Sequence, residues 1–252
     1  PAAIPMPPGF ETVPEILAFG AEQKSTFCLL RNGCALLSAH QGDLEDAATL
    51  EDYRHSIERF TELFDVSPAL LACDLHPDYF STNEALSRTA SAGNALARIQ
   101  HHHAHIASCL AENGYPLNAS PVLGIALDGL GLGDDGTLWG GELLIADYVD
   151  YRRVGRLKPV AMPGGAAAIR EPWRSLYARL DANLGWANVH AGYEQLPAIQ
   201  SLAGRALPVI DRMIASGLNA PPASSCARLF DAVAAVCGLA ADWAGYEGEA
   251  AM

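Results

Sequence analysis

The chain has 252 residues, 50% hydrophobic and 18% charged, which is typical of a globular protein with a substantial core. No apolar run approaches the roughly 20 residues that span a bilayer, so the composition excludes a membrane-spanning protein and we expect no membrane partner. A net charge of −13 without a Lys/Arg cluster disfavours a nucleic-acid partner. The 6 cysteines are scattered without a Cys-x-x-Cys pair, which indicates reduced thiols and a cytoplasmic protein.

The first half of the chain alternates between strand and helix patterns. After a proline-rich lead-in, Asn32-Gly33 stands between two apolar runs and predicts a hairpin. Thr49 with Asp52 and Ser81 with Glu84 resemble helix-start boxes. The expected strands cover 16–19, 25–30, 34–39 and 69–73, and the expected helices cover 49–64, 81–96 and 101–112.

The second half begins a similar cycle of strand, glycine-rich turn, strand, hairpin and strand. The expected strands cover 121–127, 138–148 and 151–160, and the expected helices cover 172–184, 193–202, 207–216 and 227–238. The repeated pattern predicts an α/β fold of two related lobes, at 1–119 with the histidine helix and at 120–252. The second lobe lacks a clear closing element, so we expect it to be truncated.

Four of the 8 histidines fall within residues 101–105, at the start of an expected helix. His101 and His105 are one helical turn apart, so their imidazoles project from the same side and could bind one metal ion. The alternative is a surface or core histidine cluster. His102 with His105 is a weaker pair, and His102 and His103 could instead contact the ligands or the substrate. Cys109 could be a soft ligand, although a core thiol is the simpler interpretation.

Asp128 is the natural carboxylate partner for two imidazoles. It ends a predicted buried strand, where a charged group usually has a partner, and zinc or iron sites combine imidazoles with a carboxylate. The alternative is that Asp128 caps the glycine-rich turn that follows it.

Several residues could contact an anionic ligand. Gly129 and Gly131 allow backbone amides to approach anionic oxygen, although their pattern is not a nucleotide fingerprint. Lys24 occupies the corresponding turn of the first lobe and could meet a phosphate, or could be a solvated turn lysine. Gly164 and Gly165 form another turn that could admit a nucleotide. Arg174 beside Trp173 could contact an anion or simply decorate a helix.

Together these motifs resemble the carboxyl-terminal, Kae1-like domain of the HypF carbamoyltransferases. The matching segments are residues 18–24, 38–44, 73–82, 100–105, 128–142, 163–165 and 228–233, in the same order as in the family. The resemblance implies the two-lobed actin/sugar-kinase-like fold. It also implies that upstream domains, and a later segment with a further acidic ligand, are absent from this sequence.

The resemblance implies a role in making the cyanide ligands of [NiFe]-hydrogenase. A mononuclear metal of the iron or zinc type would be held by His101, His105 and Asp128. ATP-derived carbamoyl adenylate, supplied by a YrdC-like domain, would contact Lys24 and the glycines at 129, 131, 164 and 165. The acceptor would be the C-terminal cysteine of a HypE-like partner.

Three alternatives stay open at this point. An O-carbamoyltransferase would share the metal site but would act on a sugar hydroxyl. A catalytically incomplete fragment would bind metal or nucleotide without transferring a group. The tRNA-modifying sibling family is disfavoured by the acidic balance and by the motifs.

Overall fold

The computed structural model describes residues 3–246 and 248–251. It forms two units, which we describe separately. Unit 1 contains the described residues up to Gly124 together with Ile145–Arg152, and unit 2 contains Ile125–Leu144 and the described residues from Arg153 onward. Among the described helices, none has the length and apolar character that crossing a membrane requires. The predicted lobe boundary at residue 119 stays a prediction.

Unit 1 is built on a six-stranded sheet with the order β1-β4-β3-β2-β5-β6. The strands are β1 (Ala3–Pro5), β2 (Ile16–Phe19), β3 (Phe27–Arg31), β4 (Cys34–Leu37), β5 (Leu70–Asp74) and β6 (Ala95–Ile99). The first four strands pair antiparallel, whereas β2, β5 and β6 run parallel. The predicted hairpin is confirmed, because Asn32 and Gly33 both adopt the positive φ that a type I′ turn requires.

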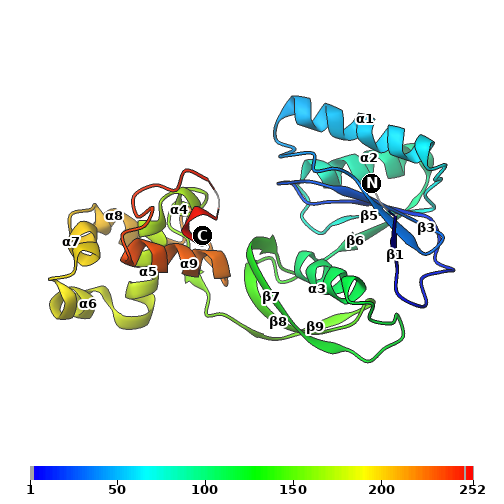
Figure 1. The fold of residues 1–252 in the computed structure, drawn as a ribbon. Coiled ribbons are helices and arrows are strands. Elements are labelled where there is room, and N and C mark those ends of the chain that lie inside the picture. The colour runs from blue at the N-terminus through cyan, green and yellow to red at the C-terminus, as the bar shows by residue number, and fades with distance from the viewer. Residues whose placement is uncertain (1–2, 247, 252) are drawn as a thin grey trace. The chain divides into compact units, whose positions relative to one another are not determined.

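Three helices accompany this sheet: α1 (Ala47–Leu63), α2 (Phe80–Ala92) and α3 (His101–Glu112). Figure 1 shows α1 and α2 on one face of the sheet and α3 on the other. Alternate residues of the strands, such as Leu17 and Leu29, are buried with Tyr53 and Ile57 of α1. This packing uses the period of two in the strands and the i, i+4 spacing in the helix.

The starts of α1 and α2 differ from the predicted boxes. Asp46 caps α1 by accepting a hydrogen bond of 2.8 Å from the Thr49 N–H. In α2 the N-cap residue Tyr79 makes no side-chain cap, and the buried Glu22 accepts a hydrogen bond of 2.7 Å from the Phe80 N–H instead. The prediction of a local Ser81/Glu84 box is therefore wrong, because a distant carboxylate from the β2–β3 turn takes its place.

Strand β6 corrects the predicted helix over 81–96. Helix α2 ends at Gly93, a left-handed C-cap, and Ala95–Ile99 then pairs in parallel with β5. Alanine and leucine suit a helix, so pairing with β5 overrides the local preference. This pairing places Asp74 opposite Ile99, two residues before His101.

Unit 2 contains most of a second sheet with the order β10-β11-β8-β7, and β9 pairs with β8. The strands are β7 (Val122–Leu132), β8 (Leu138–Ala146), β9 (Tyr151–Arg156), β10 (Val160–Ala161) and β11 (Pro222–Ala223). Strand β7 continues through the predicted turn at 128–133, and the turn lies at 133–137. Gly133 is required there, because a Cβ would lie 2.0 Å from the Trp139 Nε1 atom.

Six α-helices of unit 2 are described: α4 (Ala167–Arg170), α5 (Pro172–Leu184), α6 (Trp186–Tyr193), α7 (Pro197–Ala203), α8 (Leu207–Ser216) and α9 (Cys226–Val236), with a short 3₁₀ helix η1 (Glu249–Ala251). Their core contains Trp173, Tyr177, Leu202 and Ile210. The predicted bounds of α5 and α8 are confirmed. The helix predicted over 193–202 is wrong at its start, because Leu196 is extended and Pro197 begins α7.

Candidate metal centre

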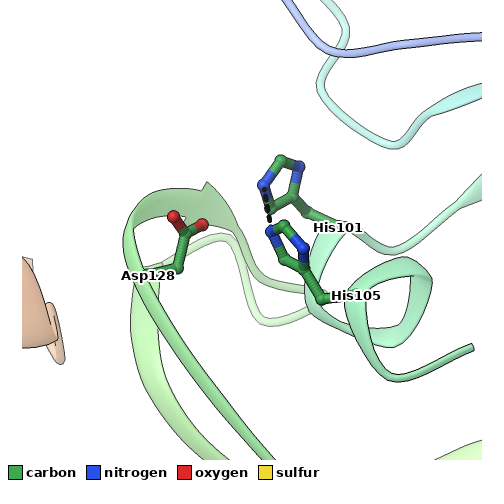
Figure 2. Close-up of side chains that lie close together, drawn as sticks. All are labelled: His101, His105 and Asp128. Carbon is green, nitrogen blue, oxygen red and sulfur yellow. Dashed lines mark hydrogen bonds between the residues drawn. The ribbon is translucent and has the colours of Figure 1, made fainter. Parts of the chain in front are cut away.

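Helix α3 brings the two predicted ligands of unit 1 together. The side chain of Gln100 caps the helix by accepting a hydrogen bond of 2.8 Å from the His103 N–H. His101 and His105 are one turn apart, and their Nε2 atoms lie 3.2 Å from each other (Figure 2). Both imidazoles therefore present the same ring nitrogen toward one point.

Asp74 contacts the first imidazole at its other nitrogen. Its Oδ2 atom lies 2.7 Å from His101 Nδ1, and its Oδ1 atom accepts a hydrogen bond of 2.8 Å from the His76 N–H. Burial acts to raise the pKa of Asp74, but hydrogen bonds from His101 and His76 and the charges of both imidazoles outweigh it and lower the pKa below the ordinary value.

Asp74 was not among the site residues predicted from the sequence. The signal was the position of this acid directly after a buried strand, next to a parallel strand that leads into the histidine helix. Parallel neighbours end at the same edge of a sheet, so their following residues meet. The signal was missed because the predicted helix over 81–96 covered the start of Ala95–Ile99 and no strand was predicted there.

A pocket of about 410 Å³ within unit 1 opens beside these groups. Small side chains of the sheet, Ala18 and Ala72 among them, line it together with Asp74, His101 and His105. Lysine and arginine are absent from the described residues that line it. The imidazole pair thus faces a space that a small ligand could occupy.

The other two histidines of the motif hold the helix start in place. His102 is fully buried, and its Nδ1 lies 3.0 Å from Gln100 Nε2. His103 Nε2 lies 2.7 Å from the backbone oxygen of Asp147, with its ring centroid 4.8 Å from that of Tyr151. Cys109 is exposed, so the interpretation of a core thiol is wrong.

Asp128 belongs to unit 2, where it lies within β7 instead of at the end of a strand. Figure 2 shows its carboxylate on this strand. The Gly129 N–H donates a hydrogen bond of 2.6 Å to Asp128 Oδ1, and the Gly129 carbonyl accepts one from the hydroxyl of Ser225, the N-cap of α9. Helix α9 thereby contacts the strand next to Asp128.

The predicted anion contacts lie in different places. Gly129 and Gly131 are part of β7, and the idea that they form a turn is wrong because the strand continues to Leu132. Lys24 is exposed in the turn before β3, where its N–H donates a hydrogen bond of 2.9 Å to Asp43. The assignment of Lys24, Gly129 and Gly131 to ligand binding stays a prediction.

A second pocket, of about 770 Å³, lies within unit 2 and includes Gly164 in its lining. Gly164 and Gly165 both have positive φ, and the Gly164 N–H donates a hydrogen bond of 2.7 Å to the Asn219 carbonyl. The guanidinium groups of Arg174 and Arg205 lie 4.8 and 4.5 Å from the ring centroid of Trp173. Arg205 was not singled out from the sequence, because only the loop before α8 brings it to Trp173.

Comparison with protein families places the molecule in the Kae1-like class of carbamoyltransferase domains. The family model "Carbamoyltransferase, Kae1-like Domain, second subdomain" matches residues 124–252, and "HypF Kae1-like domain" matches residues 11–112. The chain belongs to the HypF family.

Relatives and solved structures agree with this assignment. HypF of Rhodobacter capsulatus is 45% identical over 100% of this chain and 33% of the relative, and HypF2 of Cupriavidus necator is 43% identical over 95% of this chain and 28% of the relative. A structure described as full-length HypF in the phosphate- and nucleotide-bound form has a TM-score of 0.85 and 36% identity, covering 100% of this chain and 31% of that one.

HypF of T. kodakarensis has a TM-score of 0.84 at 34% identity, covering 100% of this chain and 33% of that one. The chain therefore spans about a third of the length of these relatives. The predicted resemblance to HypF and the predicted actin/sugar-kinase-like α/β fold are confirmed.

Proposed function

We propose that this chain transfers a carbamoyl group from carbamoyl adenylate to the C-terminal cysteine thiol of a HypE-like acceptor. The names of the relatives, all carbamoyltransferases, support the transfer of a carbamoyl group. The donor, the acceptor and the place in [NiFe]-hydrogenase maturation come from the resemblance described above. A YrdC-like domain would supply the adenylate.

In the proposed reaction the acceptor thiolate attacks the carbamoyl carbon of the adenylate. A sulfur–carbon bond forms, the bond between that carbon and the phosphate oxygen breaks, and AMP leaves with the electron pair. The thiolate is the nucleophile, so the acceptor cysteine must lose its proton to solvent before the attack. The products are AMP and an S-carbamoyl cysteine.

We assign His101, His105 and Asp128 as the ligands of one divalent metal ion, and each of these residues offers one ligand atom. The single observation that carries this assignment is the approach of the two Nε2 atoms. Two imidazoles and a carboxylate, with positions left for a substrate, suit zinc or ferrous iron. When bound, such an ion supplies a Lewis acid for the carbamoyl oxygen.

For the adenylate we propose the pocket beside Gly164 and Gly165. Arg174 and Arg205 line this pocket and offer positive charge for a phosphate. The relative described in the nucleotide-bound form supports nucleotide binding in this family. Further contacts to the phosphate are proposed for Lys24 and the backbone of Gly129 and Gly131.

The metal assignment is tested by calorimetric titration of the chain with zinc and, anaerobically, with ferrous iron. We expect one ion per chain. His101→Ala and His105→Ala each remove a ligand and should weaken metal binding by more than roughly 10- to 100-fold. That range is typical when a residue that only hydrogen-bonds to a ligand is removed. His55→Ala, which removes an exposed imidazole of α1, is the matched control and should bind normally. A His101→Ala protein with full metal content would overturn the assignment.

The choice of acceptor is tested with carbamoyl adenylate supplied by a separate YrdC-like enzyme. A peptide that ends in cysteine should gain one carbamoyl group by mass spectrometry, whereas the same peptide ending in serine should not. His101→Ala should abolish the product. Carbamoylation of a sugar hydroxyl in place of the thiol would favour the O-carbamoyltransferase alternative.

A further inference from the structure

We propose that Asp74 is a positioning residue of the metal centre, which holds His101 as the Nδ1-protonated tautomer and so keeps the Nε2 lone pair available for a metal ion. The role of Asp74 in metal binding rests on the metal site proposed above. Its hydrogen bond with His101 and the resulting tautomer do not depend on that proposal.

Both oxygens of the Asp74 carboxylate are held by hydrogen bonds. Asp74 is only 9% exposed, and its two oxygens have different partners, His101 Nδ1 at 2.7 Å and the His76 N–H at 2.8 Å. The residue closes strand β5, which pairs with β2 and β6 on its two edges. A buried group on a paired strand has little freedom to follow the imidazole, so the imidazole must adapt to it.

The chemistry of the pair then selects one tautomer. An ionised carboxylate accepts hydrogen bonds and cannot donate them, so the proton of this contact belongs to His101 Nδ1. In a neutral imidazole the other nitrogen, Nε2, keeps its lone pair. His101 Nε2 is also the nitrogen that faces His105. Metal-bound histidines commonly have such a carboxylate partner, which orients the ring and raises its basicity.

Asp74→Asn reverses this selection without changing the size of the side chain. The amide oxygen can still accept from the His76 N–H, and the amide nitrogen then faces His101 Nδ1 as a donor. His101 should shift to the Nε2-protonated tautomer, which blocks the ligand atom. We expect metal affinity to fall by about 10- to 100-fold.

The test is ¹⁵N NMR of the metal-free chain at about pH 8, above the ordinary imidazole pKa. The His101 signals, assigned with a His101→Gln variant, should show Nδ1 protonated in the natural chain and Nε2 protonated in Asp74→Asn. Asp78→Asn is the matched control, because it removes an exposed carboxylate from the same loop and should change neither tautomer nor affinity. Asp74→Glu, which restores the acceptor, should recover part of the affinity.

The outcomes separate the two proposals. An Nε2-protonated His101 in the natural chain overturns the role of Asp74, whatever the Asp74 variants show. Unchanged tautomer and affinity in a folded Asp74→Asn protein overturn it as well. A natural chain that shows the expected tautomer but binds no metal overturns the metal centre and leaves the tautomer assignment standing.

Discussion

Asp135 shows how single side chains organise the turn between β7 and β8. Its Oδ1 atom accepts hydrogen bonds from the Thr137 N–H at 3.0 Å and from Trp139 Nε1 at 2.9 Å, and its Oδ2 atom lies 3.1 Å from Arg153. Burial acts to raise the pKa of Asp135, but the hydrogen bonds and Arg153 lower it to about 2. The buried Glu142 binds the same guanidinium, so Arg153 links the turn to the core of unit 2.

The lowered pKa makes the contribution of Asp135 dependent on pH. A carboxyl whose folded-state pKa lies below 3.8 stabilises the fold above that pH and loses this effect as the pH falls toward about 2. Asp135→Asn should therefore lower the melting temperature at neutral pH, and the difference from the natural chain should shrink toward pH 2. Asp52→Asn, at an exposed site on α1, is the control. A difference that stayed constant with pH would contradict this account.

At the residue scale, the sequence predicted that His101 and His105 lie side by side, but it did not predict that Asp74 contacts His101. The spacing of His101 and His105 follows from the period of a helix alone, so no tertiary information was needed. Asp74 lies 27 positions before His101, and the contact exists only because β5 and β6 pair in register. A contact of this kind cannot be predicted when one of the two strands is not recognised in the sequence.

At the scale of elements, the packing of β7 on α3 is set by one glycine. The close approach of Gly124 to the side chain of Ile106 leaves no room for a Cβ. Ile106 is buried in turn, with 7% of its surface exposed. This contact fixes how near the backbone at Gly124 comes to the histidine helix.

Gly124→Ala should reduce the free energy of unfolding by about 1–3 kcal/mol, because overpacking displaces the strand from the helix. Urea denaturation measures the effect. In an Ile106→Ala background, Gly124→Ala should reduce the free energy of unfolding clearly less, since the Ile106 side-chain atoms that the new Cβ would meet are gone. Strictly additive costs for the two substitutions would show that the contact is not what limits the packing.

The elements that the sequence predicted well are those with strong local signals. Pro172 and Pro208 mark the starts of α5 and α8, and Asn32-Gly33 marks the first hairpin. The errors in the strands fall where tertiary pairing decides, whereas the start of α7 was predicted wrongly although Pro197 marks it locally. Gly129 and Gly131 suggested a turn, but pairing with β8 keeps β7 extended through both of them.

At the scale of the whole molecule, the α/β class follows from the alternation of strand and helix patterns. The more specific fold required the family resemblance, and the match to solved HypF structures confirms it. Because the chain spans about a third of its relatives, its activity depends on whether the residues gathered here suffice to bind metal and nucleotide. Metal binding is the first of these questions, since the proposed transfer depends on it.

X-ray absorption spectroscopy of the zinc- or iron-loaded chain measures this directly. We expect the scattering pattern of two imidazoles, with metal–nitrogen distances of about 2.0–2.1 Å for zinc, together with oxygen ligands. His105→Ala should remove one imidazole from the pattern. A loaded chain whose spectrum contains no imidazole, or whose spectrum is the same in His105→Ala, would contradict the proposed centre.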